Sequence, residues 1–128
     1  MTRKLVTSAS PLEPEIGFSR AVRVDAHVFV AGTAPIAADG SLAAPGDVCG
    51  QTRRCLEIVA AALADAGASP GHVVRTRVML TDIRQWREAA RAHGDFFRSA
   101  RPACTFVQVG GFIDPGWLVE VEADAIVD

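Results

Sequence analysis

The strictest pattern in the sequence is an alternation of apolar and acidic side chains over residues 118–125. Val119, Val121 and Ala123 fall on one face of an extended strand because successive side chains point to opposite faces. The opposite face carries Glu120, Glu122 and Asp124. Like charges on one strand face repel, so solvent, cations on neighbouring strands or a ligand must offset them. The run therefore predicts a strand with one apolar face and one charged face.

Five strand-like runs and two helix-like runs follow one another along the chain. The strands are expected at residues 20–24, 27–31, 73–80, 102–109 and 118–124, and the helices at 47–66 and 82–97. Residues 1–15 are polar and contain two prolines, so they predict an irregular N-terminal arm. The order predicts an α+β fold in which both helices cover one face of a single sheet, within one domain spanning residues 1–128.

The first helix has the clearest ends. Asp47 can cap its N-terminus, and Gly67 can supply the left-handed residue after its C-terminus. Its buried stripe is predicted to consist of Val48, Thr52, Cys55, Val59, Leu63 and Ala66. In the second helix, His93 falls on the inward stripe and is interpreted as a packed, hydrogen-bonded histidine rather than a metal ligand.

The face of the sheet away from the helices is predicted to be half polar and half apolar. Its expected members are Arg75, Arg77, Cys104, Phe106, Gln108, Glu120 and Glu122. Such a face makes a poor core and a poor solvent surface, so we expect it to meet other copies of the chain. Glu122 is expected to pair with Arg75 or Arg77.

Composition argues against several function classes. The net charge is −2 and the basic residues are scattered, which argues against a nucleic-acid-binding surface. The chain has three cysteines, Cys49, Cys55 and Cys104, and three histidines. Their positions show no metal-ligand spacing, so neither a metal nor a cofactor is expected. The odd number of cysteines, with no CxxC pair and no signal-peptide pattern at the start, predicts a cytoplasmic protein. No apolar run approaches the roughly 20 residues of a membrane span, so a soluble protein is expected.

Many short motifs occur in the order and spacing of a known family. They are residues 17–22 (GFSRAV), 28–36 (VFVAGTAPI), 51–53 (QTR), 66–69 (AGAS), 73–75 (VVR), 80–82 (LTD), 96–97 (FF), 101–103 (RPA) and 119–123 (VEVEA). Together they resemble the Rid family of reactive-intermediate deaminases, also called YjgF-like or endoribonuclease L-PSP-like. The resemblance covers the chain from Gly17 onward.

This resemblance implies a chorismate-mutase-like fold, assembled as a homotrimer with the sheets packed inward and a cleft between each pair of subunits. It also implies hydrolysis of short-lived enamines and imines to keto acids and ammonia. In the best-known members, an arginine after the Pro-Ala pair holds the substrate carboxylate, and a glutamate of the last strand helps to place the attacking water.

The chain departs from the family pattern at several positions that bind the substrate in the best-known members. Cys104 occupies the arginine position, so the chain resembles the arginine-lacking branches. Phe18 replaces a usual tyrosine, Ala90 an asparagine and Phe106 a cysteine, whereas Ser19, Gly32, Thr33 and Glu120 are retained. These replacements predict a more apolar cleft and disfavour 2-iminopropanoate as substrate. Arg20 or Arg101 could supply the missing cation.

Two classes of function follow from these residues. In the first, the chain is a hydrolase or deaminase of altered specificity, with Glu120 as general base and a small molecule bound by Phe18, Ser19, Gly32, Thr33, Ala90 and Phe106. Cys104 is either a nucleophile or, preferably, a small residue that fills the space of the arginine. In the second class, the clefts bind a metabolite and do not transform it.

Overall fold

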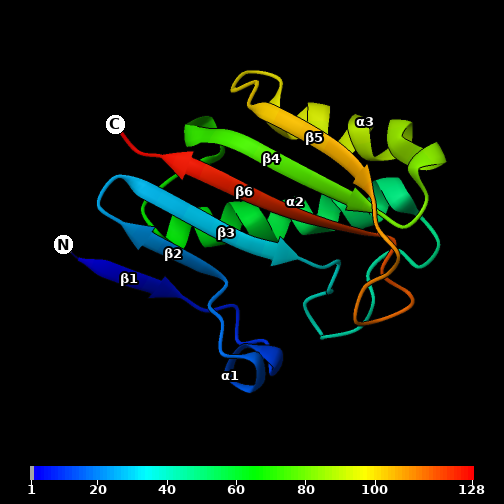
Figure 1. The fold of residues 1–128 in the computed structure, drawn as a ribbon, viewed down its shortest axis with the longest axis horizontal. Helices are drawn as coiled ribbons and strands as arrows, with labels where there is room; N and C mark the ends of the chain where they lie inside the picture. The colour runs from blue at the N-terminus through cyan, green and yellow to red at the C-terminus, as the bar shows by residue number, and fades with distance from the viewer. Residues whose placement is uncertain (1) are drawn as a thin grey trace.

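The computed structural model describes residues 2–128, which form a six-stranded sheet with two long helices on one face (Figure 1). The strands are β1 (Arg3–Val6), β2 (Ala21–Val24), β3 (His27–Thr33), β4 (Val73–Leu80), β5 (Ala103–Gln108) and β6 (Val119–Ile126). The helices are α1 (Leu12–Ile16), α2 (Val48–Asp65) and α3 (Trp86–Phe97), with short 3₁₀ turns at Pro70–His72 and Ile83–Gln85. This arrangement confirms the α+β prediction.

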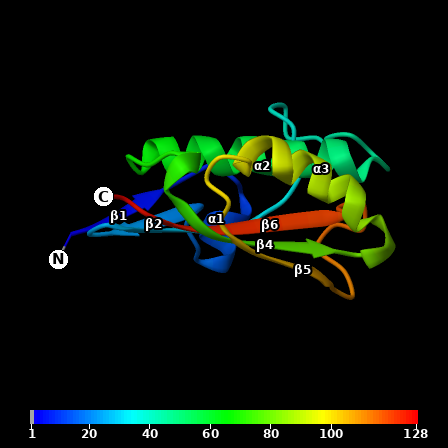
Figure 2. The ribbon, with the colours of Figure 1, turned by 90° about the horizontal axis from the view of Figure 1, so that it is seen from above.

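The strand order in the sheet is β1-β2-β3-β6-β4-β5. Neighbouring strands are antiparallel except for β4 and β5, which are parallel and are connected through α3. Figure 2 shows α2 and α3 together on one side of the sheet, while the opposite side carries neither long helix. We call this opposite side the open face.

Helix α2 forms where the sequence predicts it and for the expected reasons. The Asp47 carboxylate accepts a hydrogen bond from the Gly50 backbone N–H at 3.0 Å, which satisfies one of the free donors at the helix start. Gly67 has a φ of +82°, a left-handed conformation that ends the helix. All six residues predicted for its inward stripe are buried, and α2 packs against β6 and β3.

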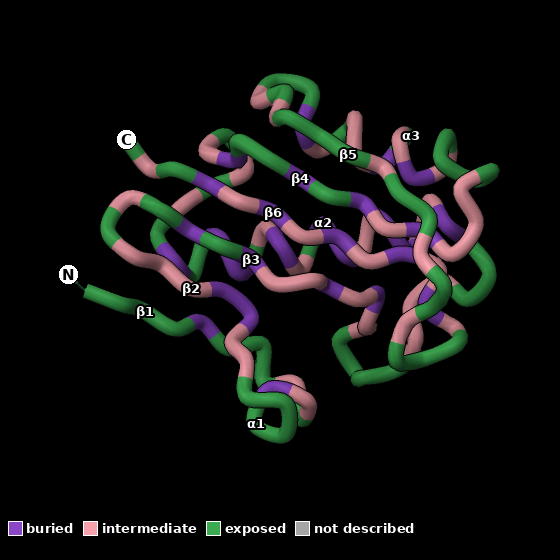
Figure 3. The backbone as a smooth tube through the Cα atoms, viewed as in Figure 1, coloured by how far each residue is buried: buried purple, intermediate pink, exposed green. Residues whose placement is uncertain are grey.

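Strand β6 lies between β3 and β4 and follows the alternation seen in the sequence. Val119, Val121, Ala123 and Ala125 are buried beneath the helices, and the acids between them lie on the open face, half-exposed (Figure 3). The Arg77 guanidinium donates to the Glu122 carboxylate at 2.8 Å, and Arg75 lies opposite Asp124 in the register. The expected pairing of β6 acids with β4 arginines is therefore confirmed for Glu122 and Arg77.

The predicted phase of β5 is wrong. Cys104 lies beside Thr76 and Phe106 beside Val78 in the register, and both β4 partners are buried on the helix side. Phe106 packs against the core there, and the Gln108 side chain accepts a hydrogen bond from the Ile83 backbone N–H at 3.0 Å. Pairing with β4 thus turns these three side chains toward α3, away from the open face on which they were expected.

Over residues 2–15 the chain forms a strand and a short helix, in contrast to the irregular arm predicted for residues 1–15; Met1 lies outside the described residues. Residues 3–6 pair with β2 as the outermost strand of the sheet. Helix α1 follows and ends at Gly17, whose φ of +88° is left-handed. The signal was present in the sequence, because Pro11 and Gly17 stand where proline and glycine favour the start and the end of a helix.

We predict that Leu80→Ala lowers the free energy of unfolding by about 2–5 kcal/mol, because its fully buried side chain leaves a cavity between β4 and the helices. Ile113→Ala is the control, since Ile113 is 68% exposed and its truncation should change stability by less than about 0.5 kcal/mol. Urea denaturation followed by circular dichroism measures both variants. Equal losses in the two would contradict this assignment of the core.

Candidate functional site

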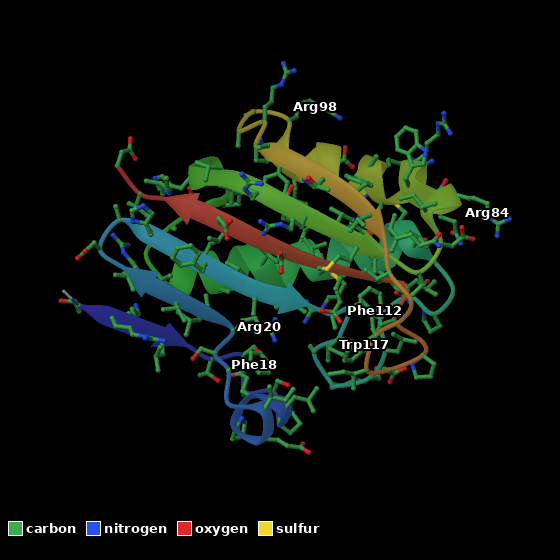
Figure 4. All side chains as sticks on the ribbon, in the orientation of Figure 1. Phe18, Arg20, Arg84, Arg98, Phe112 and Trp117 are labelled. Atoms are coloured by element: carbon green, nitrogen blue, oxygen red, sulfur yellow. The ribbon has the colours of Figure 1, made fainter. Side chains whose placement is uncertain are left out.

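A cavity of about 590 Å³ opens at the end of β3. We call it the Glu120 cavity. Figure 4 shows Phe18, Arg20 and Trp117 around this region, between α1, the end of β3 and the connection that precedes β6. Its lining comprises Ser8 to Leu12, Ile16, Phe18, Arg20, Gly32 to Ala34, Ile36 to Ala38, Gly40, Arg54, Ile58, Ile113, Trp117 and Glu120. Segments distant in the sequence therefore converge on one hollow.

Glu120 is the acid of this cavity. Burial raises the pKa of its carboxyl group, the negative charge of Glu122 raises it further, and the positive charge of Arg20 opposes both. A Cβ at Gly32 would lie 2.8 Å from Glu120 Oε1, so glycine at this position leaves room for the carboxylate beside the backbone of β3. A carboxyl group with a raised pKa suits proton transfer near neutral pH.

Arg20 is the buried cation of the cavity, with only 7% of its surface exposed. Its backbone carbonyl accepts from the Ala31 N–H at 3.0 Å, which places the residue beside the end of β3. Nη1 donates to the Gly32 carbonyl at 2.8 Å and to Thr33 Oγ1 at 3.0 Å, and the guanidinium lies 5.2 Å from the Phe18 ring centre. Burial lowers the pKa of Arg20, while the charges of Glu13 and Glu120 raise it.

Glu13 fixes the N-terminal segment that closes one side of the cavity. Its carboxylate accepts hydrogen bonds from the Thr7 hydroxyl at 2.7 Å, from the Ser8 hydroxyl at 2.6 Å and from the Ser8 and Ser10 backbone N–H groups. Burial alone would raise the pKa of Glu13, but these hydrogen bonds outweigh it and lower the pKa. The segment is thus held in place by an ionised side chain.

The second group of predicted site residues lies near β5 and α3. His93 Nε2 is 2.8 Å from Thr76 Oγ1, and its ring lies 6.1 Å from that of Phe106, in agreement with a packed histidine. Burial lowers the pKa of His93. The Cys104 side chain is exposed, but neighbouring protein atoms partly desolvate its thiol and raise its pKa, against a hydrogen bond with Thr76 that lowers it. A thiol so placed is a weak nucleophile, which favours the space-filling interpretation.

The structure therefore divides the predicted residues into two sets. Phe18, Gly32, Thr33 and Glu120 line the Glu120 cavity, whereas Ser19, Ala90, Cys104 and Phe106 do not. Of the two proposed replacement cations, Arg20 lines the cavity and Arg101 is exposed outside it. Sequence reasoning missed Arg54, Trp117 and residues 8–16, which carry no pattern that links them to the site.

Within residues 2–128, no group of three or more His, Cys, Asp or Glu side chains is placed to hold a metal ion. All three cysteines are free. No helix of the described chain is long and apolar enough to cross a membrane.

Comparisons with known proteins give consistent matches along the chain. The family model for endoribonuclease L-PSP matches residues 8–127. An uncharacterized protein of Streptomyces coelicolor is 41% identical over 120 residues, covering 94% of this chain and 89% of that protein. The 3-aminoacrylate deaminase RutC of Acinetobacter baylyi is 28% identical over 127 residues, covering 99% of this chain and 100% of the enzyme.

A solved structure also superimposes closely on this fold. It is Rv2704 from Mycobacterium tuberculosis, described as a member of the YjgF/YER057c/UK114 family, with a TM-score of 0.89 and 44% identity. The match covers 98% of this chain and 100% of that structure.

We predict that Cys104 is alkylated by iodoacetamide at neutral pH more slowly than the same cysteine in the urea-unfolded chain, because partial desolvation by neighbouring protein atoms raises the pKa of its exposed thiol. Thr76→Val should slow the reaction further, since it removes the hydrogen bond that opposes this effect. Peptide mass spectrometry measures the rate at Cys104 separately from that at Cys49. Faster alkylation in the folded chain would restore Cys104 as a candidate nucleophile.

Proposed function

The chain belongs to the endoribonuclease L-PSP family, which is the Rid or YjgF-like family, and we propose that it is a homotrimeric deaminase-type hydrolase with Glu120 as general base. The observation that carries this proposal is a half-buried carboxyl group of raised pKa inside a cavity of ligand size. The full-length match to a relative named as a deaminase supports the reaction class.

The proposed ligand site lies between subunits. Glu120, Gly32 and Phe18 form one wall, and Cys104 and Phe106 of a neighbouring copy form the other. This arrangement gives a role to the second set of predicted residues, which the single chain keeps apart from the cavity. The homotrimer is the assembly that the family resemblance implies.

The open face supports association between copies. Leu5, Phe29 and Val107 lie on it and are each more than 40% exposed. Half-exposed acids and arginines lie among them. A mixed surface of this kind resembles a protein interface, in which apolar residues are interspersed with paired charges.

In the proposed reaction, water adds to the carbon of a C=N bond and ammonia leaves, so that an imine becomes a carbonyl compound. Glu120 accepts a proton from the attacking water and passes it to the nitrogen, which gives a carbinolamine; the hydroxyl proton of this adduct then moves through the same carboxylate to the amino group, so that ammonia leaves as the carbonyl forms. The base must be ionised to start this cycle. Since its pKa is raised, the reaction rate should climb with pH at values above those of an ordinary glutamate.

A second candidate is a metabolite-binding trimer without turnover. Cys104 favours it, because a thiol cannot replace the forked ion pair that an arginine forms with a substrate carboxylate. The same absence disfavours 2-iminopropanoate as substrate, since this small molecule offers little else to bind.

We predict that Glu120→Gln lowers kcat by about 10²–10⁴-fold, because it removes the base while keeping the shape of the side chain. The substrates are imines generated in situ from a panel of amino acids by an amino-acid oxidase, and keto-acid release is followed. Asp124→Asn, on the same face of β6, is the control and should keep wild-type activity and pH profile. Unchanged turnover in Glu120→Gln would refute the role, and no turnover by the wild type would favour the binding protein.

Glu120→Gln should not unfold the chain. An acid whose pKa is raised by burial destabilises the folded state once it ionises, so folded stability falls as pH rises through that pKa. The glutamine variant avoids this loss at neutral pH and should melt no lower than the wild type, as differential scanning calorimetry can show. If the variant loses activity while its melting temperature is unchanged, the loss is due to the missing base and not to unfolding.

We also predict a particle of three times the 13.5 kDa chain mass in light scattering. Phe29→Lys should shift the population toward monomers, because it places a charge in the apolar part of the open face. The single chain should still tolerate the lysine, because its neighbour in the register is the acid Asp124. Ala64→Lys on the exposed side of α2 is the control and should leave the mass unchanged. A monomeric wild type would contradict the proposed assembly.

A further inference from the structure

We propose that the Glu120 cavity binds a monocarboxylate with an apolar body and that Arg20 holds its carboxylate. This inference rests on the proposed function in one respect, which is that the cavity is the ligand site. It goes beyond it by naming the apolar body of the ligand and by assigning its charged end to Arg20, a residue away from the family's arginine position.

The first step is the incomplete pairing of Arg20. Its two side-chain hydrogen bonds both use Nη1, and both acceptors are neutral oxygens. Nε is buried without a hydrogen-bond partner, and it is the sole side-chain nitrogen or oxygen in this condition among residues 2–128. A buried guanidinium with an unused donor is costly in free energy unless an anion completes its pairing.

The neighbouring acids do not complete this pairing. Glu13 and Glu120 both act on Arg20 through their charge, but in the described chain neither forms an ion pair with it. The Glu13 carboxylate is already engaged by Thr7, Ser8 and Ser10. The lining holds two arginines, Arg20 and Arg54, against a single acid, Glu120. The cavity therefore retains positive charge even when Glu120 is ionised.

Arg54 is the other cation of the lining, and it has partners of its own. Its Nε donates to the Ile36 carbonyl at 2.6 Å, and its Nη1 lies 3.3 Å from the Glu57 carboxylate. Arg54 is also far more exposed, with 30% of its side-chain surface accessible. Arg20 is consequently the cation that remains available to a ligand.

The rest of the lining selects the body of the ligand. The cavity has apolar walls, formed by Phe18, Ile36, Ile58, Ile113 and Trp117. Besides Arg20, Arg54 and Glu120, no charged residue belongs to the lining that the structure describes. One guanidinium suits one carboxylate, whose two oxygens it can contact with two N–H groups. The apolar walls disfavour a dianion such as a phosphate monoester, whose second charge would remain unpaired.

The position of Arg20 also suits the proposed chemistry. A carboxylate held there would lie in the cavity that contains Glu120, so the reactive part of the ligand can reach the base. Arg20 would in this way supply the cation that Cys104 cannot supply, but from the opposite wall of the cleft.

The experiment compares 3-phenylpropanoate with its neutral analogue 3-phenylpropanamide by isothermal titration calorimetry on the full chain. We expect the wild type to bind the acid at least about tenfold more tightly than the amide, because each charge-assisted hydrogen bond contributes about 1.5–3 kcal/mol. Arg20→Gln should remove this preference, and Arg20→Lys should restore part of it. Arg53→Gln changes an exposed arginine of α2 outside the lining, so it is the matched control and should change the ratio by less than about threefold.

Equal affinity of the wild type for acid and amide, or no binding of the acid, would overturn the proposal without any variant. Retention of the preference in a folded Arg20→Gln chain would overturn it as well. Glu120→Gln separates the two proposals, since it should abolish turnover while keeping the preference for the acid. Turnover that persists in Glu120→Gln refutes the role of Glu120 as general base. A wild type that turns over substrate but binds acid and amide equally refutes the role of Arg20 as the carboxylate-binding residue.

Discussion

The fold depends on the register of β6. This strand lies between β3 and β4, and its alternate residues are apolar and acidic. A slip of one residue would place Glu120, Glu122 and Asp124 beneath α2 and expose four apolar side chains, so burial against α2 strongly selects a single register. The same register fixes where the acids emerge on the open face. The core and the candidate site are thus determined by one constraint.

How much of this could be predicted depends on how sharply each segment distinguishes its two faces. In β6 apolar and acidic positions alternate strictly, and in α2 the buried stripe recurs at helical spacing, so both elements form as predicted. In β5, Cys104, Phe106 and Gln108 are hardly more polar than Thr105 and Val107, so the sequence gives no clear phase. Pairing with β4 decides it, and that pairing is a tertiary contact that no local pattern contains.

The family resemblance was accurate where it concerned the fold, and it is confirmed by the matching family model and by the superimposed structure. The site was harder to predict. Sequence comparison pointed to Glu120 and Gly32, which do line the cavity, but it could not reveal that Arg20 is buried. Burial of this arginine follows from the turn into β2 and from the carbonyl groups at the end of β3. Which charged side chain lies in a cavity depends on the path of the backbone, and this path cannot be predicted from composition.

The cavity is closed on one side by residues 8–16, which belong to a terminal segment attached through β1 and the hydrogen bonds of Glu13. This segment contributes little to the main core, so it can change in length or composition without disturbing the packing of α2 on the sheet. The shape of the cavity and the stability of the fold are for that reason separable in this architecture. Exchange of residues 8–16 would change the lining of the cavity, while the rest of the domain, including β1, continues to fold as before.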